Sequence, residues 1–251
     1  MTQKNNTMTK TASHMKNNYT YVAGITYVLI IVLSLLPSAI FDLGALLKAK
    51  NAADNLIGQE GLIRVGLAIE FLMFILVMVL SWALYMVLKP VNKGLALFGL
   101  IFRFSEAVLG CVVIMFYLAI LMLLSGADYL QAFQPEQLQA LARFFGKLGG
   151  AGYYILLFTM GVGAIAYCYL FYISGYIPKA LAIWGLITYS TMVLYGFINI
   201  ILHNPPAQLA YAMAPGALFE VCIGLWLTFK GISVKPNQTI ATEQLEPITA
   251  Q

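Results

Sequence analysis

Two charged residues lie three positions apart inside a long apolar segment of this 251-residue chain. The segment extends from Gly94 to Ser125, and Arg103 and Glu106 stand near its middle in the stretch GLIFRFSEAVLG. At the centre of a lipid bilayer, a charged side chain costs about 2.5–3.5 kcal/mol on insertion scales. A pair kept at that cost either serves a function, such as holding a solute or relaying protons, or fixes how helices pack.

Glu220 lies at a similar depth in a second apolar segment, which ends at Lys230. At a helical rise of about 1.5 Å per residue, Arg103 is about 15 Å and Glu106 about 20 Å from Lys93. Counted from Lys230, Glu220 is also about 15 Å deep. Because a hydrocarbon core is about 30 Å thick, all three side chains are predicted to lie near its midplane.

Small residues flank these charges and favour close packing of the helices that carry them. Helical spacing places four further residues on the face of Arg103: Gly99, Glu106, Gly110 and Tyr117. Gly216 and Gly224 flank Glu220 in the same way. Small residues beside polar ones let side chains bond between membrane helices. We therefore predict that these two helices are neighbours and that Arg103 bridges Glu106 and Glu220.

A second group of polar residues lies nearer the opposite membrane surface. Arg64 opens an apolar segment that contains Glu70 six residues later, and His203 ends another segment on the same side. For Arg64 alone, snorkelling to the interface is the preferred interpretation, whereas Glu70 is deeper and is predicted to point into the bundle. Two arginines then face three glutamates, so one carboxylate needs a proton, water or a cation.

The composition indicates that lipid is the solvent of this chain. Hydrophobic residues make up 61% and charged residues 10% of the sequence, against about 45–50% and about 25% in soluble domains. The net charge of +4 comes mainly from lysines in short loops beside apolar segments. That placement indicates membrane orientation and argues against nucleic acid as a partner.

The sequence offers little for metal, cofactor or catalytic chemistry. Cys111, Cys168 and Cys222 lie in separate apolar segments, none in a C-x-x-C pair, and there are two histidines. This argues against a disulfide framework and a zinc or haem site, so we expect no metal and no cofactor. With no HExxH, GxSxG or Cys/His pair, catalysis has the least support, and no catalytic residue is assigned.

The chain is predicted to be all-α, a polytopic integral membrane protein whose six transmembrane helices form one bundle over residues 19–231. The predicted spans are about 20–41, 62–88, 95–124, 150–173, 180–202 and 209–229. The polar tails, 1–18 and 232–251, are expected to be disordered.

The loops predict the orientation of this bundle. One side carries most of the lysines: Lys4, Lys10, Lys16, Lys89, Lys93, Lys179, Lys230 and Lys235. The other side has fewer cations, and these are interspersed with acidic residues. By the positive-inside rule, both termini are cytoplasmic.

One external segment has helical periodicity of its own. In residues 135–147, apolar side chains recur at i, i+3, i+4 and i+7: Leu138, Leu141, Ala142 and Phe145. This predicts a short amphipathic helix on the outer membrane surface. Capping the bundle is a more common role for such a helix than gating.

A partial internal repeat relates two parts of the chain. The stretches KGLALFGLI (93–101) and KALAIWGLI (179–187) agree at six of nine positions at an offset of 86. The offset aligns Arg103 with Tyr189, which joins the binding candidates although tyrosines in such helices more often serve packing. A genuine repeat would relate two hairpins of the same orientation by an axis along the membrane normal.

Two functions stay open on these observations. In the first, the cluster of Arg103, Glu106 and Glu220 binds or translocates a small solute or protons, with Arg103 holding an anionic group. In the second, the protein is an accessory or sensory membrane protein, and its buried ion pairs only fix helix packing.

Several stretches resemble an uncharacterised family of six-span bacterial membrane proteins, the domain of unknown function 4386. They are RVG with the acid Glu70, LKPVNKGLAL (88–97), FRFSE, IPKALAIWG (177–185) and FEVCIGLWLTFKG (219–231). The resemblance covers nearly the whole apolar region. It implies a multi-pass protein of the bacterial cytoplasmic membrane with an Arg-x-x-Glu on the third span and a glutamate on the sixth, and it implies no activity.

Overall fold

The computed structural model describes residues 18–36, 58–202 and 205–233, and all of their regular structure is helical. Six helical segments are long and apolar enough to cross a membrane. They are Asn18–Leu36, α4 (Glu60–Leu88), α5 (Lys93–Leu123), α6 (Pro135–Ser174), α7 (Lys179–Ile201) and Gln208–Phe229. The last one combines the 3₁₀ helix η2 (Ala207–Met213) with α8 (Ala214–Phe229). The prediction of an all-helical chain is confirmed for the described residues, and so is the prediction of six helices long and apolar enough to span a membrane. Both predicted tails lie almost entirely outside the described residues.

Local sequence explains where these helices begin and end. Pro90 follows the end of α4, where a proline disfavours further helix. The side chain of Asn92 then accepts a hydrogen bond from the Leu95 N–H at 2.9 Å and so caps the start of α5. Gly175 ends α6 in the left-handed conformation, at φ 66°, which costs glycine least. We call the end of the bundle that contains the short α4–α5 and α6–α7 connections its inner end.

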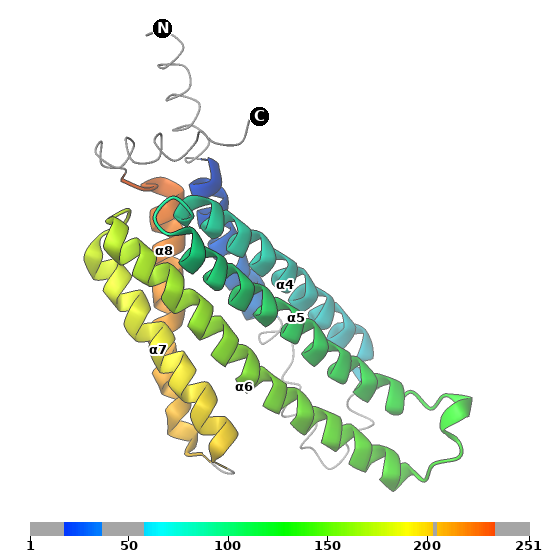
Figure 1. Ribbon diagram of the computed structural model, residues 1–251. Helices are drawn as coiled ribbons and strands as arrows, with labels where there is room; N and C mark the ends of the chain where they lie inside the picture. Colours follow the sequence, from blue (N-terminus) through cyan, green and yellow to red (C-terminus); the bar gives the residue numbers. More distant parts are fainter. Residues whose placement is uncertain (1–17, 37–57, 203–204, 234–251) are drawn as a thin grey trace, which may run out of the picture.

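The chain returns to the inner end after its last helix. Figure 1 places the start of the N-terminal helix and the end of α8 at that end. The N–H of Ser233, beyond α8, donates to the Tyr176 carbonyl in the α6–α7 connection at 3.0 Å. The opposite, outer end holds the α5–α6 connection with the short 3₁₀ helix η1 (Asp128–Leu130).

The helix boundaries at the α4–α5 and α6–α7 turns follow the 86-residue offset of the sequence repeat. Leu88 and Ser174 end α4 and α6, and Lys93 and Lys179 begin α5 and α7. Within the repeated stretches, Ala96 and Ala182 are both fully buried. The two hairpins α4–α5 and α6–α7 thus have their turns at the same end of the bundle and at the same positions of the repeat.

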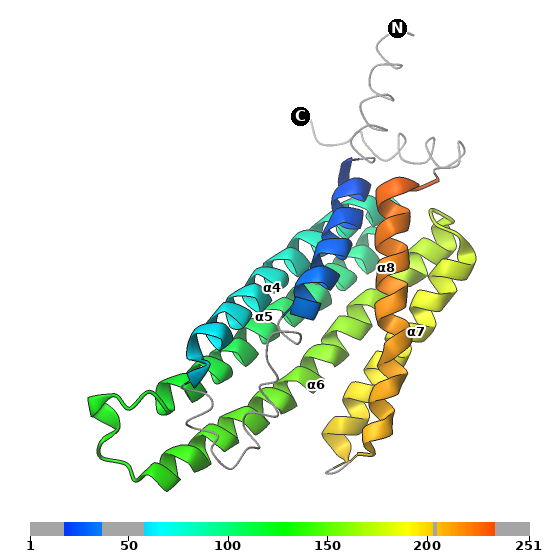
Figure 2. The ribbon, with the colours of Figure 1, turned by 180° about the vertical axis from the view of Figure 1, so that it is seen from behind.

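The helices form a bundle in which α6 is central. It packs along α5 on one side and α7 on the other, and α4 packs along α5 (Figure 1). Seen from behind, the N-terminal helix lies between α4 and α8 (Figure 2). It contacts α4 through the rings of Tyr19 and Trp82, whose centroids are 5.2 Å apart, and α8 at Gly24.

The predicted direct packing of the third span on the sixth is wrong. A Cβ atom at Gly110 of α5 would meet the Phe74 ring of α4, whereas one at Gly216 of α8 would meet Met192 and Thr188 of α7. The glycines of both helices do serve close packing, as small residues in membrane helices do. The spacing of these glycines predicts that another helix packs closely against them, but it does not identify that helix.

Residues 135–147, predicted as a separate helix, form the first part of α6. The helix has 40 residues and continues through Gly149 and Gly150 without a break. Its length of about 60 Å is twice the thickness of a hydrocarbon core. Contact of Phe145 with Phe116, at 6.1 Å between ring centroids, pairs this extension with the outer part of α5.

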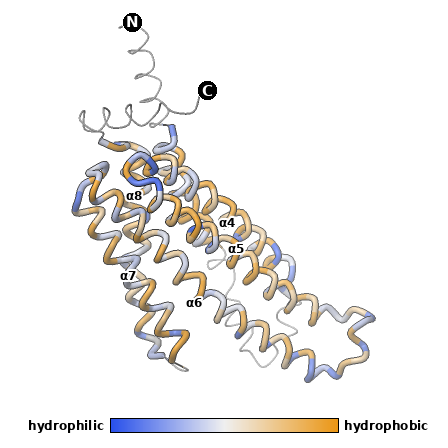
Figure 3. Tube along the Cα trace, in the orientation of Figure 1, coloured by the Kyte–Doolittle hydropathy of each residue, from blue (hydrophilic) through white to orange (hydrophobic). Residues whose placement is uncertain are grey.

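Hydrophobic residues predominate along the helices, and hydrophilic ones gather near their ends (Figure 3). Large side chains such as Ile101, Met115, Ile187 and Leu218 are exposed in the isolated chain. In water such a surface would be unfavourable, whereas lipid tails solvate it.

The tightest apolar packing occupies the inner half of the bundle. Most of the large, fully buried aliphatic and aromatic side chains lie there: Leu80, Leu84, Leu88, Leu170, Phe171, Ile223 and Leu227. This layer closes the bundle on the inner side of the charged residues.

Substitution of Gly24 by alanine tests the contact between the N-terminal helix and α8. The new Cβ atom would lie 2.5 Å from the backbone nitrogen of Thr228, so a helix has to move. We expect a loss of about 1–3 kcal/mol in stability, typical of overpacking. Thermal denaturation in lipid nanodiscs measures it, with Gly61→Ala, which meets nothing within 4 Å, as the control. Equal melting of both variants would contradict the contact.

Candidate functional site

A cavity of about 450 Å³ lies among all six membrane-spanning segments. This volume falls within the range of small-molecule sites, about 300–1,000 Å³. Its wall is largely apolar, and its polar members are Tyr27, Ser34, Glu70, Arg103, Glu106, Tyr117, Tyr153 and Glu220. The three glutamates and the arginine that the sequence places inside the bundle therefore share one cavity.

The cavity extends from the middle of the bundle toward its outer end. Measured along each helix from the inner end, Tyr27 and Glu220 lie about 14 Å deep and Arg103 about 15 Å deep. On the same scale, Glu70 lies about 27 Å and Tyr153 about 32 Å from the inner end. The charged cluster thus forms the deep end of the cavity, directly above the apolar layer.

Arg103 and Glu106 form a buried ion pair on one wall. Their side chains are 3% and 5% exposed, and the distance from Nη1 to Oε2 is 2.7 Å. Arginine has five N–H donors, so the guanidinium retains hydrogen-bonding capacity that this one contact does not use.

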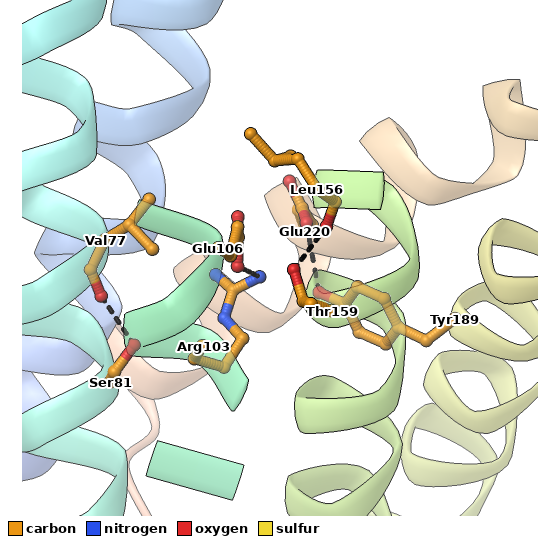
Figure 4. A network of polar contacts seen from close by, with 8 residues as sticks. All are labelled: Val77, Ser81, Arg103, Glu106, Leu156, Thr159, Tyr189 and Glu220. Carbon is orange, nitrogen blue, oxygen red and sulfur yellow. Dashed lines mark hydrogen bonds and ion pairs between the residues drawn. The ribbon is translucent and has the colours of Figure 1, made fainter. Parts of the chain in front are cut away.

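Glu220 faces the cavity from α8 and bonds to α7. The hydroxyl of Tyr189 donates to Oε1 of Glu220 at 3.0 Å, and Tyr189 itself is fully buried. Figure 4 shows the two pairs close together, Arg103 with Glu106 on α5 and Tyr189 with Glu220 on α7 and α8. The predicted bridge from Arg103 to Glu220 is wrong, since ion pairs within 4.0 Å in the described segments join Arg103 to Glu106 and Arg64 to Glu60.

Gly163 of α6 allows this helix to approach α5 closely beside Arg103. A Cβ atom at Gly163 would lie 2.9 Å from Cγ and 3.0 Å from the backbone nitrogen of Arg103. Beside it, the Tyr167 hydroxyl donates to the Ser81 carbonyl at 3.0 Å and so joins α6 to α4. The Arg103 side chain leaves a tightly packed helix interface to reach the cavity.

Glu70 lies on the outer part of the cavity wall. It is partly buried on α4, as its predicted orientation into the bundle requires. Among the residues that the structure describes, it has neither a hydrogen bond nor an ion pair. Its carboxylate is therefore available to whatever occupies the cavity.

Arg64 does not take part in this cavity. Its Nε lies 2.7 Å from Oε1 of Glu60, one helical turn away, and both side chains are substantially exposed. This agrees with the snorkelling interpretation, and it leaves one cavity arginine, not two, to face three glutamates. His203 lies outside the described residues. No three His, Cys, Asp or Glu side chains in the described part of the chain form a metal-binding group.

The cavity wall contains further residues that the sequence analysis did not name, although their helical spacing could have identified some of them. Four methionines line the cavity: Met73, Met160, Met192 and Met213. On α4, the wall residues Glu70, Met73, Phe74 and Val77 follow the i, i+3, i+4, i+7 spacing of one helix face. Tyr153, Leu156, Leu157 and Met160 repeat that spacing on α6. Extending each face from a polar residue would have found them.

The model of the family described as Domain of unknown function (DUF4386) matches residues 22–231, which include every described wall residue of the cavity. The chain belongs to this family. No curated protein and no solved structure matches it. The resemblance of the sequence to DUF4386 is thereby confirmed, and the role of the cavity in this DUF4386 member has to be argued from its own geometry.

Proposed function

We propose that this protein binds a small solute in the central cavity, within the membrane. The observation that carries the proposal is the cavity itself, in which the buried Arg103–Glu106 pair shares one wall with the carboxylates of Glu70 and Glu220. Buried polar groups of native proteins are nearly always satisfied by protein, water or ligand. A cavity beside this pair supplies the space for such a partner.

The purely structural alternative accounts less well for this arrangement. An ion pair that only fixes helix packing gains most when other side chains complete its hydrogen bonds. Here the cavity lies beside the pair, and Glu70 and Glu220 add two carboxylates to the same space. Neither of these carboxylates has a basic partner within 4.0 Å among the described residues.

We further propose that both termini face the cytoplasm and that the membrane is the bacterial cytoplasmic membrane. The lysines of the sequence support this orientation under the positive-inside rule, since Lys89, Lys93 and Lys179 lie in or beside the α4–α5 and α6–α7 connections and Lys230 follows α8. In that orientation the apolar layer faces the cytoplasm, and the cavity extends toward the external side.

Translocation of the bound solute is a second candidate function. The observation in its favour is the repeat, whose two hairpins have their turns at the same end of the bundle and at equivalent positions of the sequence. Transporters built from parallel repeats move one repeat against the other around a site near the midplane. Uptake or efflux by proteoliposomes separates translocation from binding alone.

Chemical access to the cavity tests the proposed binding function. In a background with Cys111, Cys168 and Cys222 replaced by serine, Val77→Cys places a thiol on the cavity wall. Leu84→Cys, two turns further in on the same helix, is the matched control in the apolar layer. We expect a membrane-impermeant, trimethylammonium-bearing methanethiosulfonate, added outside, to modify Val77→Cys and to leave Leu84→Cys unreacted. Two unreactive thiols would indicate a dry, structural cluster and overturn the proposal.

A further inference from the structure

We infer that the ligand of the cavity is an organic cation with an apolar body, whose charge is balanced by the carboxylates of Glu220 and Glu70 and whose body is enclosed by tyrosine and methionine side chains. This inference rests on the proposed binding function and names the chemical class of the solute.

The charges of the wall favour a cation. Arg103 is the one basic side chain among the wall residues that the structure describes, and its Nη1 lies 2.7 Å from Oε2 of Glu106. Glu70 and Glu220 have no basic partner among the described residues, so the described wall carries more carboxylates than cations. In a low-dielectric site, a cationic ligand would supply the missing counter-charge.

An anionic solute held by Arg103 fits the geometry less well. Such a solute would have to bind the guanidinium beside the carboxylate of Glu106, which is buried on the same wall. It would also lie in the cavity shared by Glu220 and Glu70. Like charges brought together in a desolvated site repel strongly.

Aromatic rings around the cavity add to its preference for cations. Tyr27 lies at the deep end, Phe74 on α4, and Tyr117 and Tyr153 toward the outer end. The face of an aromatic ring carries negative charge density and attracts an ammonium group, most strongly where water is excluded. Quaternary ammonium groups, which cannot donate hydrogen bonds, depend on such faces.

The apolar part of the wall points to an organic cation and not to a bare metal ion. Methionines from three helices and η2 line it, and their flexible, polarisable thioethers adapt to apolar groups of different shapes. A volume of about 450 Å³ exceeds what a single ion needs, and the described residues form no metal-binding group of His, Cys, Asp or Glu. A ligand with an ammonium group and a hydrocarbon body satisfies both parts of the wall.

Three probes of similar shape and different charge test this inference. Benzyltrimethylammonium is the cation, its carbon isostere neopentylbenzene is the neutral compound, and benzylsulfonate is the anion. Binding to the full chain in nanodiscs is measured by calorimetry, with empty nanodiscs as the control for partition into lipid. The variants are Glu220→Gln, Glu70→Gln and, as a control outside the cavity, Glu60→Gln.

We expect saturable binding of the cation, with no saturable binding of the neutral or anionic probe. Loss of a desolvated carboxylate should weaken cation binding about thirtyfold or more in Glu220→Gln, and Glu60→Gln should bind as the wild type does. Preferential binding of the sulfonate, or cation binding that Glu220→Gln and Glu70→Gln leave unchanged, would overturn the inference. Thiol access at Val77→Cys is measured separately from probe binding. If the thiol reacts and the cation preference fails, the proposed binding function still holds and only the inferred ligand class is wrong. If the thiol does not react, both proposals are wrong.

Discussion

Substitution of Arg103 by methionine is expected to lower the free energy of unfolding by about 3–5 kcal/mol. Methionine fills a similar volume without charge, so the carboxylate of Glu106 is left buried, 5% exposed, with no cation beside it. The loss of an ion-pair partner in the interior is much more destabilising than the loss of a surface one. Unfolding equilibria in mixed micelles measure the change.

The double variant Arg103→Met with Glu106→Leu separates the charge from the packing. Apolar replacement of both partners of a buried ion pair is often nearly neutral, so we expect the double variant to regain most of the lost stability. Arg64→Met removes the exposed pair with Glu60 and is expected to change stability by less than about 1 kcal/mol. A double variant as unstable as Arg103→Met alone would show that packing, not the unpaired charge, causes the loss.

Substitution of Gly163 by valine is expected to be the other severe change, with a loss of about 3 kcal/mol, at the upper end for overpacking. A Cβ atom there lies 3.0 Å from the backbone nitrogen of Arg103 and 3.0 Å from the Gly99 carbonyl oxygen, so α5 and α6 have to separate. Gly163→Ala should have a smaller effect in the same direction. Stability in mixed micelles and cation binding should decline together, because the contact of α5 with α6 at Gly163 also positions Arg103.

Gly150→Ala is the matched control on the same helix. No described atom lies within 4 Å of its Cβ position, and alanine favours the helix. We expect unchanged or slightly higher stability. If Gly163→Val and Gly150→Ala behave alike, α5 and α6 do not approach at Gly163 as described.

The cavity changes how the charges of this chain are balanced. From the sequence, Arg64 and Arg103 together face three glutamates. In the structure Arg64 pairs with Glu60 at the outer part of α4, so Arg103 is the one described cation that shares the cavity with Glu70, Glu106 and Glu220. The excess of carboxylates is larger than the sequence predicted, and it moves the preferred ligand from an anion to a cation.

Some of these features could be read from the sequence because they depend on distance along one helix. The depth of Arg103 and Glu220 follows from counting residues to the nearest lysine, and both do line the deep end of the cavity. The ends of α4 and α5 follow from Pro90 and Asn92, whose effects are confined to neighbouring residues.

Other features depend on which helix lies beside which, and these were missed. Gly110 and Gly216 indicate close packing, but they do not pack against each other's helices: Gly110 of α5 packs against α4, and Gly216 of α8 packs against α7. Tyr189 is the partner of Glu220 because α7 and α8 are adjacent, which no spacing within either helix reveals. For the same reason, residues 135–147 carry the periodicity of a helix without showing that it continues into α6.

By itself, the sequence determined that this is a six-span, all-helical chain with charges at mid-depth, because hydropathy, helix length and capping are local properties. Only the tertiary structure decided that Arg103 pairs with Glu106 alone, that Tyr189 holds Glu220, and that a cavity joins them to Glu70. Contacts between helices depend on the shapes of all six packed surfaces together. A membrane makes this harder to predict, since lipid and protein interior are equally apolar and hydrophobicity does not tell one helix face from another.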